Sequence, residues 1–178
     1  MYRMLERLAE GLAFALALIG GVVLVALIAL TCVSIAGRAL LPLDLGFGPI
    51  RGIYDVTEMG IAAAIFAFLP WTQMRDGHAR VDLLEPAMPR GVNRGLDLLF
   101  NAGMAAVAVV IAWRLYLGMR DKLAFGETTA VAQIPVWLGY AASVVGATGF
   151  ALVSLFCVLR AIRRLTGHDQ GERSHVQH

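Results

Sequence analysis

Two carboxylates open the stretch of the sequence in which chemistry is easiest to imagine. Asp55 and Glu58 stand just before residues 59–74, which carry no charge. A carboxylate inside a membrane helix can carry a proton, and Glu58 would lie about one turn inside such a helix. The spacing also fits a capping box, in which Asp55 accepts from free backbone N–H groups and Glu58 reaches back. A contact between Glu58 and a basic residue of a partner is a third interpretation.

His78 is the histidine that invites a metal or haem interpretation, because imidazole is a good axial ligand. A membrane haem normally needs a second histidine on a facing helix. The other histidines, His168, His175 and His178, all lie in the C-terminal tail. We therefore expect His78 to lie in a polar turn at the membrane interface, and we expect neither a metal nor a cofactor.

Residues typical of enzymes or autonomous carriers are missing from the sequence. It has no nucleophile elbow, no glycine-rich phosphate loop and no pair of carboxylates inside an apolar run, so we expect no enzyme. No Asp, Glu, Lys, Arg or His lies near the middle of the four long apolar runs. Because carriers usually keep an ionisable group or a broken helix there, we do not expect this chain to transport a substrate alone.

The composition indicates the class of protein that holds these side chains. The 178 residues are 58% hydrophobic and only 16% charged, which predicts an integral membrane protein. The basic residues are scattered at the borders of apolar runs, which does not favour binding of nucleic acid. Cys32 and Cys157 lie inside apolar runs without cysteine or histidine companions, and we interpret them as small buried hydrophobic residues.

The apolar runs predict an all-α integral membrane protein with four transmembrane helices and a short interfacial amphipathic helix between the second and third. We expect one membrane domain over residues 1–165 and a disordered cytoplasmic tail over 166–178. The expected transmembrane helices are 11–37, 55–75, 93–118 and 135–160, with the interfacial segment at 78–90. Residues 11–37 are uncharged and too long for a signal peptide, so we expect an uncleaved anchor.

Further features concern the borders and faces of these helices. Pro135 is tolerated in the first turn of the fourth helix, and Trp137 suits an aromatic belt at the membrane surface. Gly139, Ser143 and Ala147 recur every fourth residue, as do Ala102 and Ala106 on the third helix. Small residues at this spacing let helices approach closely. The sequence leaves open whether the helix that approaches belongs to this chain or to another subunit.

The positive charges predict the orientation of the chain in the membrane. Ten Lys and Arg residues lie in the N-terminal segment, the second loop and the tail, whereas five lie in the other two loops. Cytoplasmic intervals carry the excess of positive charge, so both termini are predicted to be cytoplasmic. The loops at 38–54 and 119–134 would then face outward, where Arg38 could pair with Asp55 or Glu58.

Four features in order resemble the small membrane subunit of the tripartite ATP-independent periplasmic (TRAP) transporters, over residues 12–160. Arg38 closes the first helix, and the acidic pair Asp55 and Glu58 opens the second. The most specific feature is the turn Gly77-His78-Ala79-Arg80-Val81-Asp82-Leu83-Leu84, which is similar to the family's G-H-x-x-V-D-hydrophobic turn. The last is Gln133-Ile134-Pro135-Val136-Trp137, at the start of the fourth helix.

The resemblance implies an accessory role in the inner membrane of a bacterium. A periplasmic substrate-binding protein would capture an organic acid, a large membrane subunit would move it with a sodium gradient, and this chain would brace the large subunit. Two alternatives remain: an autonomous proton-coupled carrier that uses Glu58, and a membrane anchor of a redox complex. The candidate residues for subunit contact or anchoring are Arg38, Asp55, Glu58, His78, Arg80, Asp82, Pro135, Trp137, Gly139 and Ser143.

Overall fold

The computed structural model describes residues 2–40, 48, 50–75 and 90–165 of the chain. Within these residues, four helices are each long and apolar enough to cross a membrane, as the sequence predicted. They are α1 (Tyr2–Leu40), α2 (Ile53–Met74), α3 (Arg90–Phe125) and α4 (Trp137–Leu165). Helices suit the bilayer because they satisfy every backbone polar group within one segment. The interfacial segment expected at 78–90 and the tail at 166–178 fall outside the described residues, apart from Arg90, which begins α3.

Several helix ends differ from the sequence-based bounds. α1 begins at Tyr2 instead of residue 11, and α3 continues to Phe125 instead of 118. Arg120, Asp121 and Lys122 therefore lie on α3 and not in a loop. Charge ends an apolar run but does not end a helix, because Glu, Arg and Lys are all good helix formers.

The predicted capping box at the start of α2 is wrong. The helix begins at Ile53, and its N-cap is Gly52, with no hydrogen bond from a capping side chain. Gly52 has φ of 74°, a left-handed conformation that glycine adopts without penalty. An added Cβ at Gly52 would also lie only 2.8 Å from the Cα of Ala132. This close turn requires glycine at position 52. Because the helix begins directly after it, Asp55 already lies in the first helical turn and cannot be the cap.

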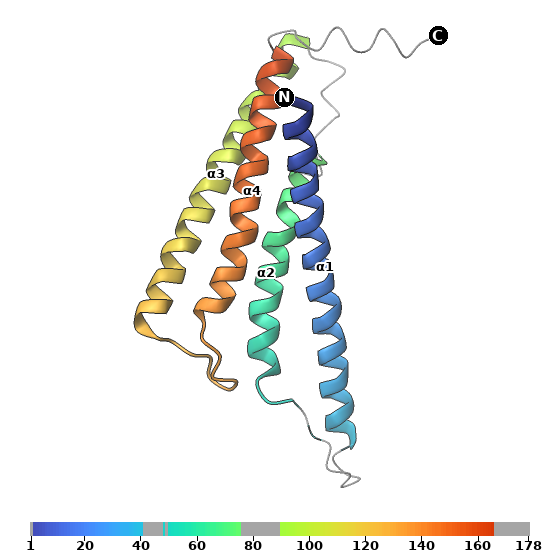
Figure 1. Ribbon diagram of the computed structural model, residues 1–178, viewed down its shortest axis with the longest axis vertical. Coiled ribbons are helices and arrows are strands. Elements are labelled where there is room, and N and C mark those ends of the chain that lie inside the picture. The colour runs from blue at the N-terminus through green and yellow to red at the C-terminus, as the bar shows by residue number, and fades with distance from the viewer. Residues whose placement is uncertain (1, 41–47, 49, 76–89, 166–178) are drawn as a thin grey trace, which may run out of the picture.

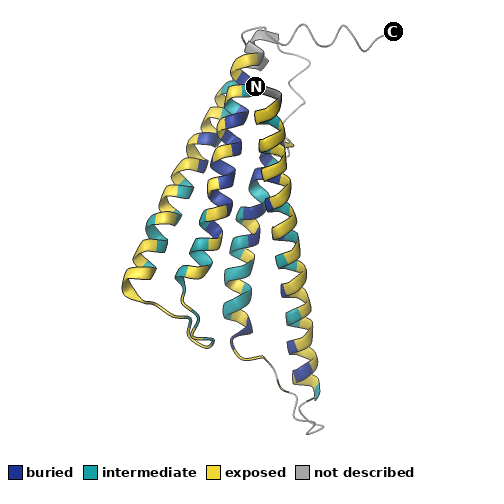
Figure 2. Cartoon of the chain, viewed as in Figure 1, coloured by how far each residue is buried: buried dark blue, intermediate teal, exposed yellow. Residues whose placement is uncertain are grey.

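The helices stand side by side in the order α3, α4, α2, α1 (Figure 1). α4 packs on both α3 and α2, and α1 packs mainly on α2. In the most apolar stretch of α4, 56% of the residues are buried, against 11% for α3. Figure 2 shows the same contrast, with buried residues concentrated on α4 and large exposed areas on α1 and α3. The fold is therefore an open row of helices with α4 and α2 at its centre.

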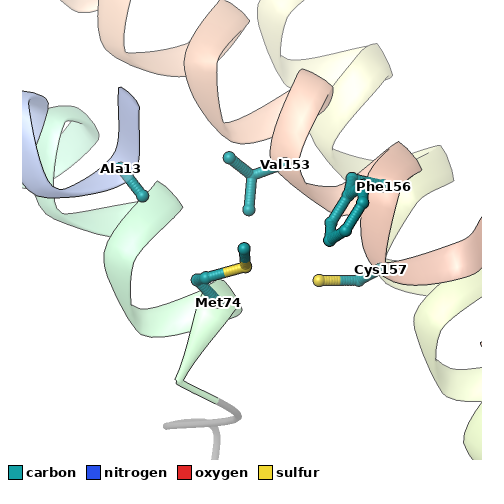
Figure 3. Packing of buried hydrophobic residues seen from close by; sticks show 5 residues of the cluster. All are labelled: Ala13, Met74, Val153, Phe156 and Cys157. Carbon is teal, nitrogen blue, oxygen red and sulfur yellow. The ribbon is translucent and has the colours of Figure 1, made fainter. Parts of the chain in front are cut away.

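Two apolar clusters hold the row together. The first joins α1, α2 and α4 through Ala13, Met74, Val153, Phe156 and Cys157 (Figure 3). The second joins α3 to α4 through Ala108, Phe150 and Ala151, with Leu69 of α2 against it. The expectation for the cysteines is half right, because Cys157 is buried in the first cluster whereas Cys32 is exposed.

The backbone of α2 lies directly against α4 at Gly146. A Cβ added there would lie 2.6 Å from the carbonyl carbon and 2.8 Å from the carbonyl oxygen of Phe66. Pro70, fully buried in α2, has no N–H to donate to that carbonyl. The proline thus frees a carbonyl at the point where only glycine lets α4 lie against it.

Candidate functional site

The start of α2 and the loop before α4 are joined by Asp55. Its Oδ2 accepts hydrogen bonds from the backbone N–H groups of Val131 (3.0 Å) and Ala132 (2.8 Å). A carboxylate that accepts two backbone N–H bonds makes strong, charge-assisted contacts. The Asp55 side chain therefore acts on a loop that is 76 residues further along the chain, and not on its own helix.

The loop that Asp55 holds, residues 126–136, is closed by its own hydrogen bonds. The N–H of Thr129 donates to the carbonyl of Ile134 (2.9 Å), and the N–H of Ile134 donates to the Thr129 hydroxyl (3.1 Å). At the loop's base, the Lys122 ammonium lies 2.6 Å from the Glu127 carboxylate. The loop is thus a built structure at one end of the row of helices, and much of it is exposed.

Glu58 and Arg38 do not take part in the contact between Asp55 and the loop. Glu58 is exposed on α2, one turn after Asp55, in line with the exposed side chains of Tyr54, Ile61 and Ile65. Arg38 is exposed in the last turn of α1. Among the described residues, no ion pair joins Arg38 to Asp55 or Glu58. Within the described residues, both side chains are therefore exposed, and neither joins α1 to α2 by an ion pair.

The fourth helix begins later than predicted. Its first residue is Trp137, so Pro135 precedes the helix by two residues instead of standing in its first turn. The Pro135 carbonyl accepts a hydrogen bond from the N–H of Leu138 (3.2 Å), which tightens the entrance of the chain into α4. Trp137 is half-buried.

The small residues of α4 pack inside the chain. Gly139 lies against the Met59 side chain of α2, and Ser143 and Ala147 are buried, with 3% and 0% exposure. The Ser143 hydroxyl donates to the Gly139 carbonyl (2.9 Å), so it stays within its own helix. The sequence left open whether this face contacts another helix of the chain or another subunit. In the structure it packs on a helix of the same chain.

On α3 the small residues form two different faces. Ala102 and Ala106, which the sequence analysis singled out, are exposed. Ala105 and Ala108, which it did not, are 5% and 0% exposed, and Ala108 packs on Phe150 of α4. The sequence shows several alanines at helical spacing on α3, but it does not show which of them face the neighbouring helix.

Two polar side chains that the sequence did not single out are buried between the helices. Gln73 and Ser154 are 4% and 0% exposed, and neither the Gln73 Oε1 nor the Ser154 Oγ has a hydrogen-bond partner among the described residues. The sequence signal that could have indicated them is a single uncharged polar residue within an apolar run. The remaining buried polar side chains in the described part are serines, so none of its carboxylate, lysine or arginine side chains is buried.

The motif with the most specific resemblance, which contains His78, Arg80 and Asp82, lies outside the described residues. Within the part that the structure describes, no group of three His, Cys, Asp or Glu side chains could bind a metal. The described arrangement offers surfaces for contact: an exposed loop held by Asp55, an exposed acid on α2 and two open outer helices.

Comparison with known proteins identifies a family. The family model described as "Tripartite ATP-independent periplasmic transporters, DctQ component" matches residues 27–167, which is most of the chain. Comparisons with curated proteins and with solved structures gave no match.

Proposed function

Because the chain belongs to the DctQ family of tripartite ATP-independent periplasmic transporters, we propose that it braces the large membrane subunit of such a transporter as a static scaffold. The chain is the small membrane component, a multi-pass protein with four spans. In the proposed assembly, a periplasmic protein captures an organic acid and the large subunit moves it with a sodium gradient. The assembly lies in the bacterial inner membrane with both termini of this chain in the cytoplasm.

The observation that best supports a scaffold is the open row of helices. A path for a substrate must be lined on all sides, whereas the described helices stand mainly in a row, with only a smaller contact between α1 and α4. The row also leaves large apolar side chains exposed on all four helices. In the scaffold role, some of these side chains contact the large subunit and the others contact lipid.

The exposed stripe on α2 is the face that we propose for docking. α2 is central, yet Tyr54, Glu58, Ile61 and Ile65 remain exposed along it. Glu58 gives this apolar stripe one acid, which would pair with a basic side chain of the large subunit. A charge pair shielded from water favours one partner and one register over others.

The first experiment is affinity isolation of the chain from its native membranes in mild detergent, followed by mass spectrometry. The expected result is a much larger polytopic membrane protein in about equal amount. Recovery of this chain alone, even after crosslinking in the intact membrane, would contradict the scaffold proposal. Transport by the purified chain in vesicles, lost in Glu58→Gln, would favour an autonomous carrier instead.

The docking face has a separate test with a matched control. Glu58→Lys should reduce recovery of the large subunit severalfold, because it reverses the charge of the proposed pair. Asp121→Lys makes the same charge change at an exposed position near the end of α3 and should leave recovery unchanged. Equal recovery with both variants would move the docking surface away from α2 without affecting the family assignment.

A further inference from the structure

A pocket of about 300 Å³ lies between the beginning of α1 and the end of α2. Its lining combines aromatic and apolar side chains with two arginines and an acid. The lining residues are Arg7, Glu10, Gly11, Phe14, Trp71, Met74 and Arg75. Nothing in the scaffold role uses this site.

The inner part of the pocket is apolar. The rings of Phe14 and Trp71 meet edge to face, with centroids 5.6 Å apart. Met74 is buried and belongs to the cluster that joins α1, α2 and α4. These contacts fix the spacing of the two helices, so the apolar wall exists before any ligand arrives.

The rim of the pocket is charged. The Arg75 guanidinium lies over the Trp71 ring, 4.6 Å from its centroid, in a cation–π contact that holds the arginine against the pocket. Arg7 and Glu10 are three residues apart and so share one face of α1. All three charged residues are exposed, and among the described residues none of them forms an ion pair. Within the described part of the chain, their hydrogen-bonding groups are therefore exposed and not occupied by ion pairs with one another.

The depth of the pocket matches the border of the bilayer. Gly11 is the first residue of the uncharged run of α1, and Met74 is the last of the uncharged run of α2. The apolar wall thus lies level with the beginning of the lipid acyl chains, next to the glycerol, and the charged rim lies level with lipid headgroups. Arginine and tryptophan are both favoured at this level of a membrane.

We propose that this pocket binds the headgroup of one phospholipid molecule. The phosphate lies between the guanidinium groups of Arg7 and Arg75, which suit planar, bidentate contacts with phosphate oxygens. Glu10 takes the ammonium of an ethanolamine headgroup, so the pocket prefers phosphatidylethanolamine to phosphatidylglycerol. An acyl chain follows Phe14 and Trp71. This inference rests on the pocket and its depth, and it does not depend on the proposed scaffold role.

The test uses the full chain, purified in detergent after reconstitution with a defined mixture of phosphatidylcholine, phosphatidylethanolamine and phosphatidylglycerol. Native mass spectrometry should find one retained phosphatidylethanolamine per chain. The double variant Arg7→Gln, Arg75→Gln should retain about tenfold less, equivalent to about 1.4 kcal/mol. The matched control, Arg114→Gln with Arg120→Gln, removes the same charge from exposed positions on α3 and should retain as much as the wild type. Equal retention in the two double variants would overturn the proposal.

A second variant keeps the proposal testable if the double variant does not fold. Glu10→Gln should still retain a phospholipid but should lose the preference for phosphatidylethanolamine over phosphatidylglycerol. An unchanged preference would overturn the assignment of the ammonium to Glu10.

Free phosphate is distinguished from lipid by the fluorescence of Trp71 in a variant with Trp113→Phe and Trp137→Phe. Short-chain phosphatidylethanolamine should produce a saturable change in the delipidated protein, and inorganic phosphate should not. A saturable change with inorganic phosphate alone would identify a site for a soluble anion and overturn the lipid assignment.

Discussion

Asp55 illustrates how one side chain can link distant segments of a membrane protein. Its carboxylate accepts the N–H groups of Val131 and Ala132, so the first turn of α2 carries the loop that leads into α4. Gly52 allows this arrangement, because its missing side chain lets Ala132 lie against the backbone. Gly52 and Asp55 together thereby hold the loop at residues 126–136 against the start of α2.

Asp55→Ala should loosen the loop at residues 126–136. Without the carboxylate, the N–H groups of Val131 and Ala132 lose their acceptor and exchange with solvent more readily. Hydrogen exchange measured by mass spectrometry should show severalfold faster exchange for a peptide that contains both residues. Glu58→Gln is the matched control, because it removes a charge one turn away that holds no loop. Unchanged exchange in Asp55→Ala would show that the loop is held by its internal hydrogen bonds alone.

Gly146 is the residue on which the contact between the two central helices depends. Gly146→Ala places a Cβ against the Phe66 carbonyl, which is backbone and cannot move aside alone. We expect a loss of about 1–3 kcal/mol in stability, as for overpacking elsewhere, seen as a lower midpoint of thermal unfolding in detergent. Gly103→Ala is the control, since nothing lies within 4 Å of the Cβ it would add. Equal midpoints for the two variants would contradict this packing.

At the scale of the helices, α4 is the element that contacts all three others. It contacts α3 on one side and α2 on the other, and it shares an apolar cluster with Ala13 of α1. α3 touches it through alanines, which allow the close approach that substitutes for a hydrophobic driving force within lipid. α3 therefore packs on α4 through one face only, and the structure shows that this face contains Ala108.

Neighbouring alanines of α3 give a direct test of that face. Ala108→Leu should cost about 1–3 kcal/mol of stability because the added atoms have no room between α3 and α4. Ala106→Leu adds the same atoms on the exposed face and should change stability by less than about 0.5 kcal/mol. Both midpoints are measured on the purified chain in detergent. The reverse order would mean that α3 is rotated from the described position.

At the scale of the whole molecule, the open row explains why this chain suits an assembly. The N-terminal end of α1 and the C-terminal end of α4 lie at one end of the row, and the loop held by Asp55 lies at the other (Figure 1). α1 and α3 flank the row and are largely exposed. Such a molecule has two broad faces, and in the proposed transporter one of them meets the large subunit.

The proposed orientation is tested by labelling with a membrane-impermeant maleimide in spheroplasts. Cys32 and Cys157 are first replaced by alanine. A cysteine at Val131, which is 61% exposed, should then be labelled from outside, whereas one at Leu8, which is 59% exposed, should react only after lysis. Labelling of Leu8→Cys alone in intact spheroplasts would place the termini on the outer side.

The sequence by itself determined that the chain is a membrane protein with four spans, and short motifs around Asp55, His78 and Pro135 indicated the family that the comparison then showed. The spans could be predicted because the bilayer requires uncharged stretches of sufficient length and satisfies no backbone groups itself. Helix ends were less predictable, since α1 and α3 continue into charged residues that also favour helix.

Only the tertiary structure decided which faces of the helices pack together. In water, the apolar face of a helix identifies its buried side, but in lipid every face is apolar and the period of the sequence loses this information. Ala106 and Ala108 are chemically identical, yet one is exposed and the other is fully buried. The role of Asp55 was hidden for a second reason: the backbone groups that it binds lie far along the chain and are brought to it by the packing of α2 on α4.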